Sequence, residues 1–342
     1  MNNSNQVKKK IFSLFSQNLE WVKEHPLISF NPNFTNGYIC PLCFEVFFED
    51  DLSASKKNHL TLEDIPPKSL GGKPLALTCK NCNSKSGHEL DIHLLNRLQE
   101  IDSHLFLKNS KANATYELNG NKINGIVEID QNRSVKLHLQ TNRSNPIESR
   151  KLIKDLFPPV ITNKVFKTPN FNLELHKRSN ENRAEVAVLR IAYLLAYATF
   201  GNSFLINSGL FKVREQILNP DKEILQKPYW IIYDFPKEAE GINIIIQPKE
   251  LRSFLVIFNL VTKSQSRQIA IALPGPSKNG LKIYDYIKNN LCTERGGELN
   301  RCTLKHIPQK DYLKIKDYAF ACNWFWQEWT KDEYKPTITL KH

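Results

Sequence analysis

Two Cys-x-x-Cys pairs in the first quarter of the chain constrain its fold more than any other feature of the sequence. They are Cys40-Pro-Leu-Cys43 and Cys79-Lys-Asn-Cys82, and 35 residues separate them. A Cys-x-x-Cys turn aims both sulfurs at one point, and two such turns complete a tetrahedral zinc site that has no position open for substrate. We therefore predict a structural zinc ion held by these four cysteines, on which a segment with little core of its own depends for folding.

The other cysteines and the N-terminus indicate the cellular context. The chain has seven cysteines, an odd number, and the apolar run Ile-Phe-Ser-Leu-Phe after the N-terminal lysines is too short for a signal-peptide core. No stretch reaches the length of a membrane span. We therefore expect a cytoplasmic protein with neither a disulfide framework nor a membrane partner.

A second zinc site is not expected in the C-terminal part of the chain. The remaining candidate ligands do not have the Cys-x-x-Cys spacing of a zinc knuckle: Cys292, Cys302, His306 and Cys322.

The segment around the two pairs resembles the HNH endonuclease family. The sequence LTLEDIPPKSLGG (60–72) lies between the pairs, and LTCKNCNSKSGHELD (77–91) contains the second pair and the residues after it. Members of this family are ββα-metal nucleases, many of them stabilised by a four-cysteine zinc ion. They have an acidic residue and a histidine before an Ile-x-Pro turn, often Gly-Gly after it, and then a C-x-x-C-N knuckle and a helix with further ligands. The resemblance covers roughly Tyr38 to Glu100 and implies an HNH-like, treble-clef-like zinc domain.

Carried over residue by residue, the resemblance implies a second metal site, for one divalent cation. Glu63 falls on the acidic position, and Asp64 falls on the position of the histidine. His88 and Asp91 lie where the family has its last ligand. The implied ligands of Mg²⁺ or Mn²⁺ are therefore Glu63, Asp64, His88 and Asp91, and Asn83 falls on the asparagine of the knuckle. The turn residues fall on Pro67, Gly71 and Gly72.

Asp64 departs from the family pattern, in which a histidine is the general base. A carboxylate with a pKa of about 3.9 is a weak base near neutral pH, although it is a good ligand for Mg²⁺ or Mn²⁺. Three interpretations of Asp64 stay open. It is a metal-bound base whose pKa is raised by burial, or it is a metal ligand while His88 or His59 activates the water. In the third interpretation, Asp64 marks the loss of catalysis. The first two interpretations are favoured because the other acidic and imidazole groups are present. The residues predicted to act in catalysis are Asp64, His88 and Asn83.

The charge of the chain favours a polyanionic partner. Lysine and arginine total 47 against 35 aspartates and glutamates, a net charge of +12, and each cation placed on a phosphate releases condensed counterions. Four lysines lie close to the motif and are predicted to contact nucleic acid: Lys68, Lys73, Lys80 and Lys85. Together with the resemblance, these features predict a metal-dependent endonuclease that hydrolyses phosphodiester bonds of DNA. By analogy with the family, its role would be defence against foreign DNA.

Two alternatives to an active nuclease stay open. The first is a non-catalytic, zinc-stabilised protein that binds nucleic acid, with Asp64 marking the loss of the base. The second is a nuclease subunit that is silent until a partner engages the C-terminal part of the chain. Binding without cleavage would support the first, and cleavage only in the presence of an added factor would support the second.

The fold class predicted from the whole chain is α+β. We expect an N-terminal helical segment at 1–36, the HNH-like domain at 37–102 and a strand-containing basic connector at 103–183. A larger α+β domain with a mainly antiparallel sheet is expected at 184–342, because Ala184–Phe200 reads as a buried helix and several Ile- and Val-rich runs follow it. This last domain is a candidate for contacts with a second copy of the chain or with another protein.

Overall fold

The computed structural model describes most of the chain. The described residues are 3–26, 28–140, 144–156, 171–227, 230–232, 235–247, 252–275, 280–291, 303–308, 312–320 and 337–340. Cys292, Cys302 and Cys322, which were considered above as ligands of a second zinc site, lie outside the described residues. The chain forms two compact units, each described here by itself. Unit 1 combines Met1–Leu94, Glu181–Leu260 and Ser266–His342, and unit 2 combines Leu95–Asn180 and Val261–Gln265.

The helices of unit 1 come from both halves of the chain. They are α1 (Asn3–Lys23), α2 (Lys80–Ser86), the π-helical turn η3 (Gly87–Asp91), α5 (Glu181–Phe200), α6 (Asn202–Leu205), α7 (Gly209–Leu218), α8 (Lys282–Tyr286) and the π-helical turn η7 (Ile287–Leu291). The 3₁₀ turns are η1 (Glu49–Leu52), η2 (Lys68–Leu70), η5 (Lys237–Ala239) and η9 (Lys316–Tyr318). Helix α3 (Ile92–His104) follows η3 directly, and most of its residues belong to unit 2.

The largest sheet of unit 1 has five strands and is built from the C-terminal half of the chain. Its strand order is β10 (Trp230–Ile232), β13 (Ser266–Pro274), β12 (Ser253–Val261), β11 (Gly241–Gln247) and β14 (Thr303–His306). The pairs β10–β13, β11–β12 and β11–β14 are antiparallel. The α+β class and the antiparallel sheet predicted from the sequence are therefore confirmed.

Smaller strand pairs involve the N-terminal part of unit 1. Two are antiparallel hairpins, β2 (Tyr38–Ile39) with β3 (Val46–Phe47), and β4 (Leu60–Ile65) with β5 (Lys73–Cys79). One is parallel, β1 (Ser29–Asn31) with β15 (Thr337–Thr339). The hairpin β4–β5 runs into α2 at Cys79, so the segment 60–86 has the order strand, strand, helix.

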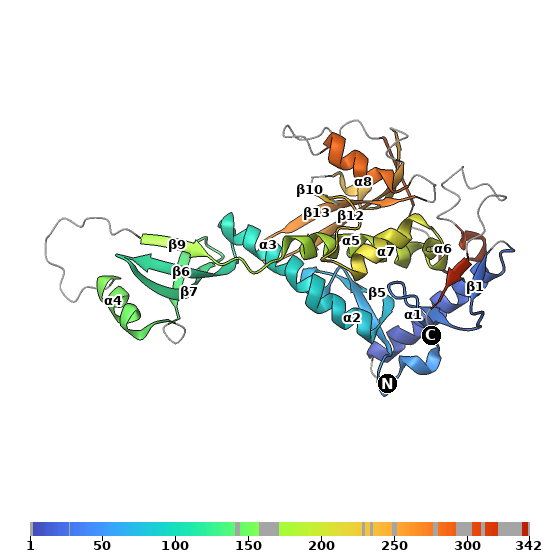
Figure 1. The fold of residues 1–342 in the computed structure, drawn as a ribbon, viewed down its shortest axis with the longest axis horizontal. Coiled ribbons are helices and arrows are strands. Elements are labelled where there is room, and N and C mark those ends of the chain that lie inside the picture. The colour runs from blue at the N-terminus through green and yellow to red at the C-terminus, as the bar shows by residue number, and fades with distance from the viewer. Residues whose placement is uncertain are drawn as a thin grey trace. The chain divides into compact units, whose positions relative to one another are not determined.

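Helix α5 is the centre of unit 1. Its sequence is apolar nearly all round, which predicts a buried helix, and 13 of its 20 residues are buried. It packs against α7 and β13 and also against β4 and β5. Figure 1 shows α5 between the five-stranded sheet and the β4–β5 hairpin. The helix ends at Gly201, whose φ of 69° lies in the region that favours glycine.

Hydrogen bonds join α5 to the first cysteine pair, so the expected N-terminal and C-terminal domains share one unit. Tyr193 donates to the carbonyl of Pro41 at 2.9 Å, and Tyr197 donates to the carbonyl of Ile39 at 3.4 Å. One break between the two units falls between Asn180 and Glu181. The separation of 37–102 from 184–342 is not observed, because α5 buries its apolar surface against both.

Unit 2 is a four-stranded antiparallel sheet with a helix on one face. The strand order is β8 (Val135–Leu139), β7 (Asn121–Ile129), β6 (Lys111–Leu118) and β9 (Phe171–Leu175), and helix α4 spans Pro146–Leu156. Burial alternates along β6 and β7, as expected for a sheet with one covered face. Leu152 of α4 packs into the core formed by these strands, as the position of α4 in Figure 1 indicates. The predicted basic connector therefore has a core of its own.

Candidate metal centre

Four cysteine sulfurs form the clearest candidate site. The Sγ atoms of Cys40, Cys43, Cys79 and Cys82 all lie within 4.8 Å of one another. Cys43 Sγ and Cys79 Sγ are 3.8 Å apart, and a tetrahedron of Zn–S bonds of about 2.3 Å has edges of about 3.8 Å. Cys40, Cys79 and Cys82 are buried and Cys43 is half-buried. The cluster therefore has the donors, size and enclosure to bind a metal ion such as zinc.

Local backbone geometry brings the sulfurs together. The first pair lies in the turn of the β2–β3 hairpin, where Phe44 has a φ of 63° and donates its N–H to the carbonyl of Cys40. The second pair joins β5 to α2, with Cys79 as the residue before the helix. The backbone N–H of Cys82 donates to Cys79 Sγ at 3.4 Å, and that of Cys79 donates to Cys40 Sγ at 3.5 Å. Such N–H groups stabilise thiolate ligands, as expected around a metal site.

The electrostatics of the cluster also favour a bound cation. Burial, followed by the neighbouring sulfurs, raises the pKa of Cys40 well above its usual value. Four thiolates so close together repel one another. A coordinated divalent metal would offset this repulsion by its positive charge and would keep the thiols deprotonated. The donor set of four sulfurs selects a soft metal rather than Mg²⁺ or Ca²⁺.

Glu63, the acidic residue of the predicted second metal site, is buried beside this cluster. It lies on β4 with its side chain 4% exposed. The register between β4 and β5 shifts between Glu63 and Asp64, and Leu75 is left without a partner residue. Thr78 of β5 donates its hydroxyl to Glu63 Oε2 at 2.6 Å, and Arg190 Nη2 donates to Glu63 Oε1. A buried carboxylate needs such partners.

Asp91, predicted as another ligand of the divalent cation, bonds the same arginine. Arg190 Nη1 donates to Asp91 Oδ1 at 3.0 Å, and the side chains of Arg190 and Asp91 are 1% and 18% exposed. Burial raises the pKa of Asp91 to about 6, although the charge of Arg190 acts in the opposite direction. Burial disfavours the charged form of Arg190, yet Glu63 and Asp91 outweigh it and raise the pKa of the guanidinium.

Arg190 therefore lies between the two carboxylates that the resemblance assigns to a cation. Each carboxylate bonds a different nitrogen of the one guanidinium. Glu63 and Asp91 therefore do not fit a divalent ion in this arrangement, because the positively charged guanidinium of Arg190 already occupies the position between them. Among the described residues, only the four cysteines form a group of metal-ligand atoms at mutual coordination distance.

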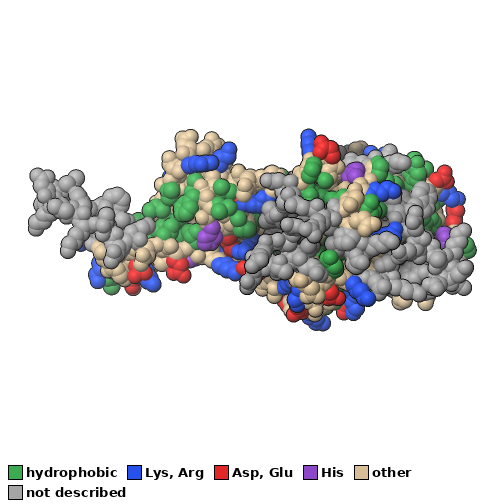
Figure 2. All heavy atoms as spheres, turned by 90° about the horizontal axis from the view of Figure 1, so that it is seen from above, with side chains coloured by type: hydrophobic (Ala, Val, Ile, Leu, Met, Phe, Trp, Pro, Cys, Tyr) green, Lys and Arg blue, Asp and Glu red, His purple; other side chains and the backbone are tan. Residues whose placement is uncertain are grey.

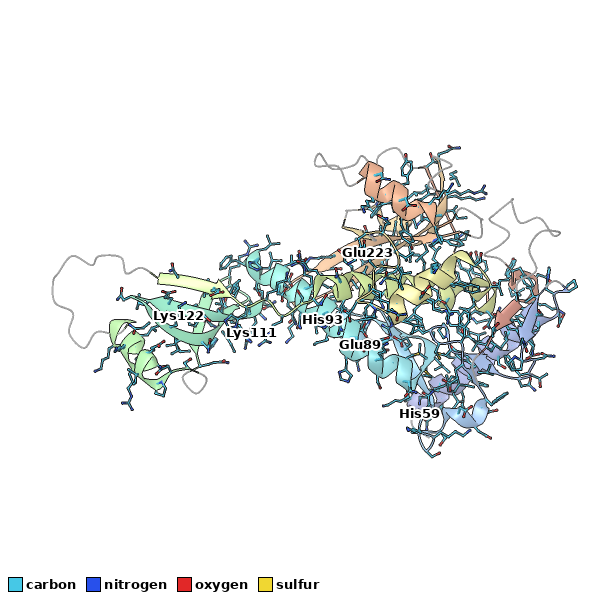
Figure 3. All side chains as sticks on the ribbon, in the orientation of Figure 1. His59, Glu89, His93, Lys111, Lys122 and Glu223 are labelled. Atoms are coloured by element: carbon cyan, nitrogen blue, oxygen red, sulfur yellow. The ribbon has the colours of Figure 1, made fainter. Side chains whose placement is uncertain are left out.

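The other predicted site residues do not join this cluster. Asp64 is half-buried on β4 and His88 is exposed. In the part of the chain that is described, no hydrogen bond or ion pair links either of them to Glu63 or Asp91. His59 Nδ1 lies 2.9 Å from the carbonyl of Lys56, in the loop before β4 (Figure 3).

Asn83 connects helix α2 to strand β4. Its Nδ2 donates to Thr61 Oγ1 at 2.8 Å and to the carbonyl of Leu62 at 3.1 Å. Thr61 in turn donates to the carbonyl of Thr78 on β5. Asn83 therefore holds the strand that carries Glu63 and Asp64 against the helix that follows the second cysteine pair. Its amide nitrogen is occupied by the protein itself.

The turn between β4 and β5 needs its two glycines. Gly71 has a φ of 91°, and a Cβ atom at Gly72 would lie 1.4 Å from the carbonyl oxygen of Pro66.

The four lysines predicted to contact nucleic acid differ in their surroundings. Lys68, Lys73 and Lys80 are exposed. Lys85 donates to the carbonyl of Leu218 at 3.0 Å and lies 3.8 Å from Glu89, so only three of the four predicted lysines are free to contact a ligand among the described residues.

Arg190 is the site residue that the motif did not point to. The signal for it was present, since an arginine inside an apolar helix must have a buried partner. The sequence did not say which carboxylate that partner is. The two partners lie 127 and 99 residues away along the chain.

Comparison with known proteins does not assign this arrangement to a family. No family model, curated protein or solved structure matches the chain. Within the described residues, no helix is long and apolar enough to span a bilayer. The function is therefore inferred from the site itself.

Replacing Asp91 by asparagine is expected to change how stability depends on pH. The pKa of Asp91 is raised to about 6 from 3.8, so the folded chain binds a proton that the unfolded chain releases between these values. Raising the pH through this window therefore destabilises the wild type. From pH 5 to pH 7 the free energy of unfolding of Asp91→Asn, measured with urea, should gain about 1 kcal/mol relative to wild type. A difference that stays constant with pH would refute this assignment.

Proposed function

We propose that this chain is a zinc-stabilised protein that binds nucleic acid on a nuclease-like ββα segment without cutting it. The four cysteines would hold a structural zinc ion that fixes the β2–β3 turn to the start of α2. This zinc has no position open for substrate, so its contribution is to folding.

The observation that carries the proposal is the double hydrogen bond of Arg190. Its guanidinium neutralises Glu63 and Asp91 in the interior, where the resemblance to the HNH endonucleases implies a cation. Arg190 is 1% exposed, so it cannot itself reach a phosphate of a substrate. The carboxylates thus support the fold in place of binding Mg²⁺ or Mn²⁺. The aspartate at position 64, where the family has its basic histidine, agrees with this interpretation.

The choice of nucleic acid as ligand rests on charge. The chain has a net charge of +12, and Lys68, Lys73 and Lys80 are exposed around the β4–β5 hairpin. Lysines and arginines (blue) also lie on the described surface of both units in Figure 2. Such a protein gains binding free energy from counterion release on any phosphate backbone.

A metal-dependent DNA endonuclease is the second candidate. The half-buried Asp64 and the exposed His88 favour it, because both can still reach solvent and a substrate. This candidate requires Arg190 to release Asp91, whose side chain is 18% exposed. A partner that engages the C-terminal part of the chain would then activate a latent enzyme, whose role by analogy with the family would be defence against foreign DNA.

A plasmid assay separates the two candidates. The purified chain is incubated with supercoiled DNA in Mg²⁺, Mn²⁺ or EDTA, and binding of a labelled duplex is measured in the same buffers. We expect equal binding in all three and no nicking in any. Nicking that needs added metal, and that is lost in a zinc-replete Asp64→Asn/His88→Ala variant, would overturn the proposal in favour of the endonuclease. The control variant Asp50→Asn, at an exposed position of the turn η1, should then keep the nicking activity.

A further inference from the structure

Unit 2 carries more than its share of the positive charge. Its 91 residues contain 15 lysines and arginines and 8 aspartates and glutamates, so +7 of the net +12 belongs to about a quarter of the chain. Neither cysteine pair lies in this unit, and no residue predicted to act in catalysis does. The charge there calls for an explanation of its own.

Helix α4 presents three of these cations on one face. Leu152 and Ser149 are buried against the sheet, whereas Arg150, Lys151 and Lys154 are exposed. Ile147, which is 65% exposed, lies on the same face, since positions 147, 150, 151 and 154 follow the helical repeat. At a rise of 1.5 Å per residue, Arg150 and Lys154 are about 6 Å apart along the helix axis, so the three cations can reach neighbouring phosphates of one nucleic-acid strand.

Cations on the sheet of unit 2 are neutralised, in contrast to those on α4. Lys111 lies 3.3 Å from Glu128, Lys122 lies 3.6 Å from Glu117 and Lys136 lies 3.2 Å from Asp130. Figure 3 shows Lys111 and Lys122 on this sheet.

Glu148, the acidic residue in the first turn of α4, is turned toward the sheet and accepts a hydrogen bond from the backbone of Lys122. Among the carboxylates whose side chains the structure describes, none lies within ion-pair distance of Arg150, Lys151 or Lys154.

We infer that the exposed face of α4 is a nucleic-acid-binding surface, with Arg150, Lys151 and Lys154 on consecutive backbone phosphates. The inference rests on the proposed function for the class of ligand, and it adds where that ligand is held. Three cations that form no ion pair with a described carboxylate, on a helix that is anchored by its opposite face, form a positive stripe. A phosphate backbone supplies the complementary charge, and its contacts carry no sequence preference.

The test uses the full chain and compares two triple variants. In Arg150→Gln/Lys151→Gln/Lys154→Gln the α4 stripe is neutralised, and in the matched control Lys111→Gln/Lys122→Gln/Lys136→Gln three paired cations of the same unit are removed. Both lower the net charge by the same amount. Binding of labelled duplex DNA and of duplex RNA is measured by fluorescence anisotropy over a series of salt concentrations.

The α4 variant is expected to lose roughly 100-fold in affinity near 0.1 M salt, and its plot of log K against log salt should flatten by about 2 to 3 units. The control should keep the wild-type slope. Equal effects of both variants, an unchanged slope in the α4 variant, or tighter binding to anionic lipid vesicles than to either nucleic acid would each overturn the inference.

A third variant separates this inference from the proposed function. If Lys68→Gln/Lys73→Gln/Lys80→Gln abolishes binding while the α4 variant binds as wild type does, the ββα segment holds the nucleic acid alone. The proposed function then stands and the α4 surface is refuted. If the wild type binds neither DNA nor RNA at low salt, both fail.

Discussion

Replacing Arg190 by methionine is expected to lower the free energy of unfolding by about 3 to 5 kcal/mol, because it leaves two buried carboxylates without their counter-charge. Methionine keeps the length and the apolar contacts of the arginine stem, so the loss reports on the charge. Urea unfolding of the zinc-replete chain, followed by circular dichroism, measures it. The triple variant Arg190→Met/Glu63→Gln/Asp91→Asn should recover most of the loss, since it contains no uncompensated charge in the site.

Arg183 provides the matched control on the same helix. Its guanidinium binds both carboxylate oxygens of Asp221, at 2.9 and 2.7 Å, but the side chain of Asp221 is 61% exposed. A surface pair of this kind contributes about 0 to 1 kcal/mol, so Arg183→Met should be nearly neutral. Equal losses at Arg183 and Arg190 would show that the buried position of Arg190 gives it no special role.

The Arg190→Met variant also reports on the relation of this site to a metal centre. If the guanidinium stands in for a divalent cation, Mn²⁺ should raise the melting temperature of the variant and leave that of the wild type unchanged. Such a difference would follow from mass action on a site that only the variant leaves open. If neither Mn²⁺ nor Mg²⁺ stabilises the variant, Glu63 and Asp91 serve only as the acidic partners of Arg190 in a buried ion-pair cluster.

Local sequence patterns were sufficient for some features of this molecule. The Cys-x-x-Cys spacing identified four residues whose sulfurs converge, because each turn is determined within four residues. The apolar composition of Ala184–Phe200 predicted a buried helix, and the Ile- and Val-rich runs predicted strands. In each case the physical cause lies within the segment that shows the pattern.

Other features depend on contacts that no local pattern contains. The resemblance assigned His88 and Asp91 to one metal site from their positions in the sequence alone. The chain forms the π-helical turn η3 at these residues, and Asp91 turns inward to Arg190 while His88 stays exposed. The connection of the N-terminal hairpins to α5 likewise required the tyrosines of a helix more than a hundred residues further along the chain.

Removing the zinc ion that we propose for the four cysteines is expected to have the largest effect on the protein, and this effect should reach beyond the cysteine turns. The first turn is held by α5 and α7 as well as by the sulfurs. Arg214 of α7 donates to the carbonyl of Leu42 at 3.1 Å and lies 3.8 Å from the centre of the Phe44 ring. Cys82→Ser, or a zinc chelator, should therefore lower the stability of unit 1 by at least about 5 kcal/mol and its melting temperature by 10 °C or more.

Hydrogen exchange can show how far this loss extends. Amides of α5 and of the β4–β5 hairpin should lose protection in Cys82→Ser, because their packing depends on the clamped turn, whereas β6 and β7 of unit 2 should keep theirs, since they have a core of their own. Cys302→Ser, which removes a thiol outside both knuckles, should retain one zinc ion per chain and the wild-type exchange pattern. Loss of protection confined to the two cysteine turns would mean that α5 holds unit 1 together without the metal, and the zinc would then stabilise only the segment that carries its ligands.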